Sequence, residues 1–347
     1  MANETLKRIF GFDNLKRVFR FAAPYKERFY WSIWLGIFLA IITPVRPYLI
    51  KITVDKYIAS KMLDWILWMT VIQIGLLLIE SVMRFYFTYL TAWLGQTVVR
   101  DMRVKVYEKV VNLNLRVFDQ TPVGILTTRT INDIEAINDI FSDGLVPIVA
   151  DLLSIISILL FMFYVDWRLT LVCLAAFPIL LIATYYFKES VNKSFIKVRN
   201  AVAQLNAFVQ EHITGMQVVQ AFAAEDREFD KFRAINRSHR DANISAIFAY
   251  SVFFPVVEIV LALSTGLLVW WIAGRAGASA AEARELGGKM MMFYMCLNLL
   301  FRPLRVIADK FNVLQMGVIA SERVFKVLDN PDYIKKEGNY APPRVDG

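Results

Sequence analysis

Residues 65–113 read WILWMTVIQIGLLLIESVMRFYFTYLTAWLGQTVVRDMRVKVYEKVVNL and combine two helix patterns in one stretch. The first part, to Ile79 and past Arg84, is apolar enough to cross about 30 Å of hydrocarbon. The second part repeats apolar residues at three- and four-residue spacing among Arg and Lys: Val99, Met102, Val106, Val110 and Leu113. One helix over the whole stretch would run about 70 Å, more than twice the hydrocarbon thickness. The stretch therefore predicts a membrane helix that continues into water.

A turn follows this helix. The residues Asp119-Gln-Thr-Pro122-Val-Gly124 favour a break, and we expect a new amphipathic helix to start near Ile125 and to run into the next apolar segment. The connection from Leu90 to Asp143 is therefore expected to be a helical hairpin in water with its tip near Phe118. The same construction is expected between Lys188 and Asn243, where Gly215 lies in the middle.

Further apolar segments recur along the chain and give six predicted spans: 29–42, 65–79, 145–165, 169–187, 244–273 and 290–301. Only Asp166-Trp167-Arg168 separates the third from the fourth, which predicts a tight helical hairpin. The composition agrees, because 57% of the residues are hydrophobic and the mean hydropathy is +0.45. We expect an all-α membrane protein with six long transmembrane helices and two cytoplasmic helical extensions.

Charge sets the expected orientation. Lys and Arg are concentrated before the first span and in the two long connections, and such cationic segments stay in the cytoplasm. A multi-pass protein of the cell (inner) membrane with both termini cytoplasmic is expected, in contact with membrane lipid. The net charge of +8 is explained by these segments, so no nucleic-acid partner is expected. Cys173 and Cys296 both lie inside apolar spans, so no disulfide framework or metal site is expected.

The two ends of the chain carry signals of their own. Near the N-terminus Leu15, Val18, Phe19 and Ala22 fall on one helical face and Lys16, Arg17 and Arg20 on the other, which favours an interfacial elbow helix. An ordinary solvated basic terminus is the alternative. The first residues also lack the pattern of a cleaved signal peptide. At the other end Asn330-Pro331-Asp332 breaks a helix, and the Pro- and Gly-rich residues after it are expected to be a linker.

Short motifs recur in an order that resembles one known family. Pro47-Tyr48-Leu49-Ile50-Lys51 resembles the outer end of the first span, and Phe118-Asp119, Gly124, Arg129 and Asn132-Asp133 resemble the first intracellular loop. Glu211, Gly215 and Val218-Val219 resemble the second loop, and Ala320-Ser321-Glu322-Arg323 the exit of the sixth span. Together they resemble the transmembrane domain of an ATP-binding-cassette (ABC) exporter half-transporter of the multidrug or lipid type.

This resemblance implies three segments: a tail with the elbow helix over residues 1–28, a six-helix membrane domain over 29–329, and a linker toward a nucleotide-binding domain over 330–347. The intracellular loops would cover about 96–140 and 188–243. It further implies a domain-swapped homodimer or heterodimer, with ATP and Mg²⁺ bound by the nucleotide-binding domains and no cofactor in this chain. The residues that would couple the loop tips to those domains are Arg116, Phe118, Asp119, Gln120, Thr121, Gly124, His212, Thr214, Gly215 and Gln217.

The chain departs from the complete family pattern in one respect. No Gly-x-x-x-x-Gly-Lys-Ser/Thr phosphate loop occurs in it, and the nearest candidate, Gly288-Lys289, is followed by Met290 and preceded five residues earlier by Ala283. We therefore expect no catalytic residues here. The nucleotide-binding domain is expected either as a separate chain or beyond the Pro-rich end, and that ending favours the second.

Polar residues within spans are the remaining candidates, because they are costly there. Glu80 and Arg84 are four apart and are expected to neutralise each other. For the other candidates the resemblance implies a cavity that takes an amphiphilic drug-like molecule, lipid or peptide, lined by Arg46, Glu258, Phe254, Tyr294, Asn298 and Arg302. A structural pair of Glu258 with Arg302, and lipid-facing aromatic side chains, are the alternatives. A membrane scaffold or receptor without a transport cycle is the rival function, and a membrane enzyme is disfavoured because paired acids and His clusters are missing.

Overall fold

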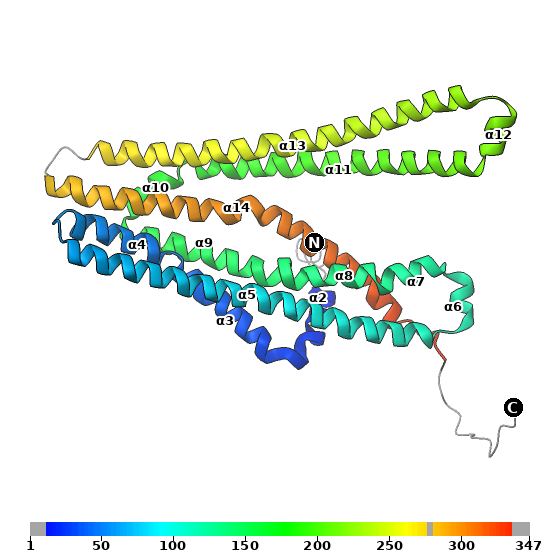
Figure 1. Cartoon of the computed structure of the whole chain (residues 1–347), viewed down its shortest axis with the longest axis horizontal. Helices are drawn as coiled ribbons and strands as arrows, with labels where there is room; N and C mark the ends of the chain where they lie inside the picture. The colour runs from blue at the N-terminus through cyan, green and yellow to red at the C-terminus, as the bar shows by residue number, and fades with distance from the viewer. Residues whose placement is uncertain (1–11, 276–279, 335–347) are drawn as a thin grey trace, which may run out of the picture. The chain divides into compact units, whose positions relative to one another are not determined.

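The computed structural model describes residues 12–275 and 280–334, and these are helical apart from turns and one isolated β-bridge (Figure 1). The predicted tail residues 1–11 and the predicted linker residues 335–347 lie outside the described part. By its contacts the chain divides into two compact units. Unit 1 comprises Met1–Leu49, Ser60–Leu160 and Val306–Gly347, and unit 2 comprises Ile50–Ala59 and Phe161–Arg305.

Unit 1 is built around α5, Leu63–Val111, which is 49 residues long. Its other elements are α2 Phe12–Ala22, η1 Ala23–Tyr25, α3 Lys26–Ile42, α6 Leu115–Gln120, α7 Val123–Thr130, α8 Asn132–Asp139, η3 Ile140–Gly144, most of α9 Leu145–Val165 and the second part of α14 Ala280–Leu328. The continuous helix predicted from residues 65–113 is therefore confirmed.

Apolar side chains are exposed on the first half of α5 and buried on the second. From Leu63 to Tyr89 they are mostly exposed, whereas from Thr91 to Val106 they are largely buried. Exposed aromatic residues lie at both ends of the first half: Trp65, Trp68, Phe85, Tyr86 and Tyr89. Trp65 and Tyr86 lie about 31 Å apart along the helix axis at 1.5 Å per residue, which matches the hydrocarbon thickness. The first half of α5 therefore has the surface of a membrane span.

The second half of α5 belongs to a hydrophobic core within unit 1. Its Leu94, Val98, Met102 and Val106 pack with α8, η3, the end of α14 and α2 through Ile134, Ile137, Phe141, Leu314, Val324, Phe325, Leu15 and Val18. An ion pair of 3.1 Å from Arg323 on α14 to the buried Asp133 on α8 ties two of the family-like motifs together. This core holds the elements that carry the first hairpin tip.

Helix α2 contributes its apolar face to that core. Leu15, Val18 and Ala22 are buried, whereas Lys16 and Arg20 on the same helix are exposed. The amphipathic helix predicted near the N-terminus is therefore present, and its apolar face contacts protein. Its placement in the headgroup layer stays a prediction.

Close helix crossings break the path from the first hairpin tip into the third span. A Cβ at Gly95 would lie 2.4 Å from Oδ1 of Asn138, and one at Gly317 would lie 2.5 Å from Cγ1 of Ile140. At this crossing residues 140–144 form a π-helix, and nearer the tip α7 and α8 are separated at Ile131. This differs from the single helix predicted from Ile125 into the third span, because packing against α5 and α14 displaces the turns.

Unit 2 contains an antiparallel pair, α11 Phe177–Thr214 and α13 Glu225–Ala273, joined by the short α12 Met216–Ala221 (Figure 1). Stacked rings of Phe187 and Phe253, 3.9 Å apart, hold the pair together. The predicted excursion around Gly215 is confirmed as helical. Unit 2 also contains α10 Trp167–Leu174 and the first part of α14.

The first predicted span, 29–42, lies within α3 and ends at a break, whereas the fourth contains an interruption. After Thr43-Pro44 the chain continues as α4 Val45–Ile52 and the π-helix η2 Thr53–Ile58. The fourth divides at Ala175-Ala176 into α10 and α11, whose first turn contains Pro178, because proline lacks the N–H that would continue the preceding helix. Between the third and fourth, Asp166 accepts hydrogen bonds from the N–H groups of Arg168 and Leu169, which confirms the tight turn.

Five helical stretches among the described residues are long and apolar enough to cross a membrane: Asp13–Ile58, Leu63–Val111, Val123–Val165, Trp167–Thr214 and Glu225–Ala273. They cover the first five predicted spans. The predicted sixth span lies on α14, which is a 49-residue helix but is not among these five.

Candidate functional site

The first candidate site is the tip of the unit 1 hairpin. After α5 ends, Asn112 and Leu113 turn the chain, and α6 runs for only six residues before Pro122 starts α7. The side chains of Arg116, Phe118, Asp119 and Gln120 are exposed along α6, Thr121 is half-buried after it, and Gly124 is exposed in the first turn of α7. The structure therefore brings together all six residues predicted for this tip.

Apolar side chains are also exposed at this tip. Leu115 is 79% exposed and Val123 is 70% exposed, although both lie far along the chain from the apolar half of α5. Exposed apolar groups that lie together mark a surface for contact with another protein or with a membrane. Sequence reasoning missed Leu115 and Val123, although each directly flanks the residues that it singled out.

The tip is anchored to the segment that leaves α14. The N–H of Ile334 donates to the carbonyl oxygen of Asn112 at 2.7 Å, and the N–H of Asn114 donates to that of Asp332 at 3.2 Å. Leu113 and Tyr333 thus form an antiparallel β-bridge. Asp329, three residues before Asp332, accepts two hydrogen bonds of 2.7 Å from Arg17 of α2. The Arg17 guanidinium lowers the pKa of the Asp329 carboxyl, so this contact stays charged at neutral pH.

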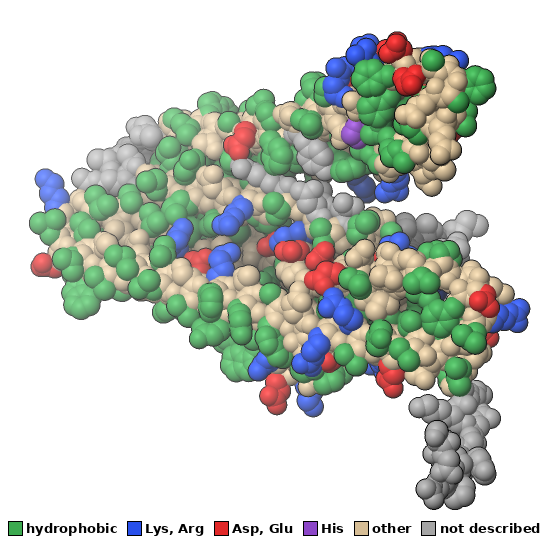
Figure 2. Space-filling model, turned by 45° about the vertical axis from the view of Figure 1, so that its right-hand side comes forward, with side chains coloured by type: hydrophobic (Ala, Val, Ile, Leu, Met, Phe, Trp, Pro, Cys, Tyr) green, Lys and Arg blue, Asp and Glu red, His purple; other side chains and the backbone are tan. Residues whose placement is uncertain are grey.

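The second candidate site is the tip of the unit 2 hairpin, and charged side chains surround it (Figure 2). The N–H of Gly215 donates to the carbonyl oxygen of Glu211 at 2.8 Å and closes α11, and α12 follows at once. Thr214 and Gln217 are exposed, and Phe222 at the far end of α12 is 80% exposed. A Cβ at Gly215 would lie 3.1 Å from that Glu211 oxygen, so there is little room for a side chain.

His212 joins the two long helices just below this tip. Its ring stacks on Phe208 at 3.7 Å, Nδ1 lies 2.7 Å from the Phe208 carbonyl oxygen, and Nε2 lies 3.1 Å from Glu228 Oε2 on α13. The hydrogen bond to Glu228 raises the pKa of His212. Lys231 first and His212 next lower the pKa of Glu228 to about 2. Sequence reasoning singled out His212 but not Glu228, because no local spacing relates residues on the two opposite helices of a hairpin.

The predicted cavity residues lie on three helices. In unit 2, Phe254 and Glu258 are one turn apart on α13 and both are exposed. Tyr294, Asn298 and Arg302 follow at four-residue steps on α14, where the Asn298 amide donates to the Tyr294 carbonyl oxygen at 2.9 Å. Each helix therefore presents its candidates on one face. Arg46 lies on α4 in unit 1 and is half-buried.

Unit 1 contains a polar cavity of about 250 Å³ between α3, α5, α9 and α14. Lys310 of α14 pairs with Asp151 of α9 in its wall, and Arg84 of α5 lies in the same wall. Arg84 also binds Glu80 at 2.9 Å, which confirms the predicted neutralising pair. Sequence reasoning missed Lys310, which lies 159 residues from Asp151.

Comparison with known proteins identifies the fold. The family model described as ABC transporter transmembrane region matches residues 29–304. An ATP-dependent lipid A-core flippase of Thiobacillus denitrificans is 27% identical over 347 residues, which is 100% of this chain and 58% of that protein. A putative multidrug export ATP-binding/permease protein of Bacillus subtilis is 27% identical over 336 residues, which is 93% of this chain and 57% of that protein.

An uncharacterized ABC transporter ATP-binding protein of Bacillus subtilis is 26% identical over 322 residues, 93% of this chain and 54% of that protein. The chain spans about half the length of the curated relatives it matches. The family match covers most of the chain and confirms the resemblance seen in its motifs. This multi-pass membrane protein belongs to the ABC transporter transmembrane region family.

Proposed function

We propose that the chain forms the translocation pathway of an ATP-driven exporter and receives force from nucleotide-binding domains at its two hairpin tips. In this proposal α14 is the sixth span, residues 29–329 are the membrane domain, and residues 1–28 and 330–347 are its interfacial start and its linker. The clustering of Lys and Arg in the long connections supports cytoplasmic termini in a cell membrane.

The observation that carries this proposal is the exposure of apolar residues on both tips. Each hairpin ends in a six-residue helix, α6 or α12. Leu115, the first residue of α6, is 79% exposed, and Phe222, directly after α12, is 80% exposed. A rigid helix pair with such an end is suited to dock in a groove of a motor domain and to transmit its movement. The ten tip residues predicted from the sequence would form these contacts.

The tie between Asn112–Asn114 and Asp332–Ile334 supports the same assignment. A domain that follows the exit segment would act on the first tip through this bridge as well as through α6. ATP and Mg²⁺ would be bound by the nucleotide-binding domains, since this chain contains no phosphate loop. A second membrane domain, identical or related, would complete the pathway.

The proposed cargo is an amphiphile, that is, a lipid, a drug-like molecule or an amphiphilic peptide. In unit 2 the faces with Tyr294, Asn298 and Arg302, and with Phe254 and Glu258, combine aromatic and polar groups. Arg46, in unit 1, stays a separate candidate predicted from the sequence. Two relatives carry the names of a lipid A-core flippase and a multidrug exporter, which supports this class.

The test separates ATP turnover from transport. Phe118→Glu and Gly215→Glu are compared with Val104→Glu, which changes an exposed apolar residue of α5 away from the tip. The chain is reconstituted with nucleotide-binding domains in vesicles with a fluorescent lipid. We expect the two tip variants to insert normally, to lose most ATP-dependent lipid movement and to alter ATP turnover, while Val104→Glu matches the wild type. Unchanged lipid movement in both tip variants would contradict the tip assignment.

A further inference from the structure

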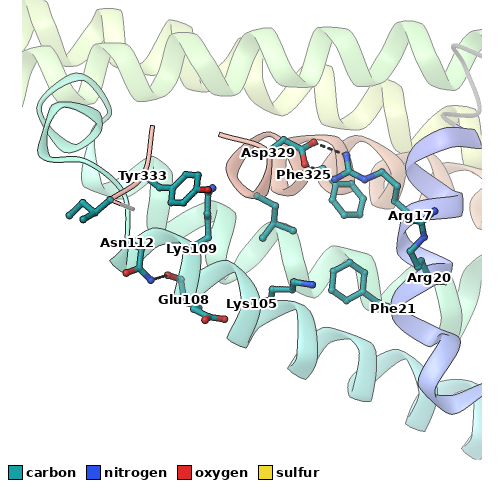
Figure 3. A pocket seen from close by; sticks show the side chains of 12 residues that line it. Arg17, Arg20, Phe21, Lys105, Glu108, Lys109, Asn112, Phe325, Asp329 and Tyr333 are labelled. Carbon is teal, nitrogen blue, oxygen red and sulfur yellow. Dashed lines mark hydrogen bonds and ion pairs between the residues drawn. The ribbon is translucent and has the colours of Figure 1, made fainter. Parts of the chain in front are cut away.

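A cavity of about 620 Å³ opens in unit 1 where α2, the water-facing end of α5 and the segment after α14 converge (Figure 3). Four cationic side chains line it, Arg17, Arg20, Lys105 and Lys109, against two carboxylates, Glu108 and Asp329. Its charge is therefore positive. Its lining shares no residue with α6, which carries the first tip, or with the cavity at Lys310.

Most of the positive charge has no carboxylate partner. Arg17 is matched by Asp329, with two bonds of 2.7 Å. Among the residues that the structure describes, no carboxylate lies within ion-pair distance of Arg20, Lys105 or Lys109. Glu108 is exposed, and among the described residues its carboxylate forms no ion pair. Within the described ranges Arg20, Lys105 and Lys109 thus form no direct ion pair, and the four cations of the lining exceed its two carboxylates by two charges.

Aromatic rings position the cations without neutralising them. The Lys109 ammonium lies 3.9 Å from the Tyr333 ring centroid and the Lys105 ammonium lies 5.2 Å from that of Phe21. The Arg17 guanidinium lies 4.1 Å from the centroid of Phe325. A ring face attracts a cation but leaves its N–H groups free to donate to oxygen acceptors. Figure 3 shows Lys109 reaching from α5 to Tyr333 across the cavity.

The walls of the cavity are fixed before any ligand arrives. Lys105 and Lys109 are one turn apart on α5, and Val106 between them is fully buried in the core of unit 1. Phe325 is buried in the same core, and the β-bridge at Tyr333 holds the third wall. Less side-chain and loop ordering is then needed on binding, and a preformed site retains more of its interaction free energy.

We propose that this cavity binds a phosphate-bearing anion, supplied either by a soluble compound or by a lipid headgroup. Several donors from different elements, arranged around one space, match the many oxygens of a phosphate group. The bound anion would bridge α5 and α2 beside the exit segment, and would therefore stabilise the contact between that segment and the first hairpin. Lys105 lies about 24 Å along α5 beyond Tyr89, the last exposed aromatic residue of the membrane-spanning half, at 1.5 Å per residue. A lipid headgroup would have to bridge this distance from the membrane, whereas a soluble anion would not.

The test uses the full chain in phosphatidylcholine nanodiscs. Inorganic pyrophosphate is titrated by calorimetry against the wild type, K105Q/K109Q and K16Q, where Lys16 is an exposed cation of α2 outside the cavity. In a second arm without pyrophosphate, nanodiscs with phosphatidylglycerol are analysed by native mass spectrometry for retained lipid. Thermal unfolding without ligand verifies that each variant is folded, and Arg20→Gln provides a second variant.

Saturable binding of at least one probe is expected, weakened about tenfold or more in K105Q/K109Q and by less in Arg20→Gln, with K16Q equal to the wild type. Pyrophosphate binding alone would assign a soluble anion, and retained phosphatidylglycerol alone would assign a headgroup. The proposal is overturned if neither probe binds saturably. It is equally overturned if K16Q weakens binding as much as K105Q/K109Q, because the attraction would then be a general effect of net charge.

Discussion

The two halves of α5 form one continuous helix, yet they place the same residue types in opposite surroundings. Leu67, Ile74 and Leu78 are exposed on the first half, whereas Leu94, Val98 and Met102 are fully buried on the second. None of the most apolar window of α5 is buried inside the protein. In lipid an exposed Leu costs nothing, because the tails around it are as apolar as the side chain. In water the same side chain must be covered.

This contrast assigns different tasks to the two halves. The first half needs length and apolar surface, and it contacts its neighbours where a small residue permits, as at Gly36, whose Cβ would lie 3.2 Å from Phe87. The second half needs a core with other helices, and that core positions the hairpin tip. Changes along α5 should therefore have effects that depend on which half they touch.

The largest effect is expected from a charge in the core of the second half. Met102 is fully buried, and Met102→Asp would place an unpaired carboxylate there, which should cost about 4 kcal/mol or more of unfolding free energy. Thermal unfolding in nanodiscs measures the loss. Val104 is 65% exposed two residues further along, so Val104→Asp should change the stability by about 0.5 kcal/mol at most. Equal losses at both positions would contradict the burial of this half.

A smaller effect is expected from two glycines on the same helix. A Cβ at Gly95 meets Asn138 and Phe141 within 3.3 Å, so Gly95→Leu should cost about 1–3 kcal/mol through overpacking. Gly75 in the first half has nothing within 4 Å of its Cβ position, and Gly75→Leu should be neutral or should gain up to about 1 kcal/mol from helix propensity. Chemical denaturation in matched detergent compares the two. A larger loss at Gly75 would reverse the comparison.

The water-facing hairpin of unit 2 should respond to pH, whereas lipid-facing segments should not. The pKa of His212 is raised above its ordinary 6.5 by Glu228, so the tie between α11 and α13 is complete below the unfolded pKa and is lost as pH rises through the folded one. Glu228, with a pKa lowered to about 2, stays ionised throughout.

Hydrogen exchange over residues 205–230, corrected for intrinsic rates, should therefore show more opening at pH 8 than at pH 5.5. His212→Gln should remove this dependence, because glutamine does not titrate. A pH dependence that persists in this variant would assign it to another group.

The smallest effect is expected from an exposed ion pair on the second half. Arg103 binds Glu135 at 2.9 Å, with both side chains about half exposed. A double-mutant cycle with Arg103→Gln and Glu135→Gln should give a coupling of about 0.2–1 kcal/mol that decreases at high salt. A larger, salt-independent coupling would mean that a protein surface outside unit 1 covers the Arg103–Glu135 pair.

The sequence predicted what depends on local pattern. The length of α5, the break before Pro122 and the helical excursion with Gly215 in its middle follow from periodicity and from residues that end helices, and all are present. The π-helix at Ile140–Gly144 was missed, because it arises where Gly95 and Gly317 admit neighbouring helices. This packing depends on three segments that lie far apart in the chain: α5, η3 and α14.

The candidate sites divide in the same way. Tip residues such as Phe118 and Gln217 could be found because turns leave local signals, and the structure places them on exposed short helices. The pairs Lys310 with Asp151 and His212 with Glu228 join distant positions, so no local spacing predicts them. Likewise, the cationic cavity forms only when α2, α5 and the exit segment meet.

Site-directed spin labelling along α5 tests the contrast between its halves most directly. Single labels at Ile74, Leu78, Val104 and Tyr107, all exposed positions, are compared in proteoliposomes for collision with oxygen, which concentrates in lipid, and with a water-soluble nickel chelate. We expect oxygen to dominate at Ile74 and Leu78, and the nickel chelate to dominate at Val104 and Tyr107. Oxygen dominance at all four positions, or nickel dominance at the first two, would contradict a helix that passes from lipid into water.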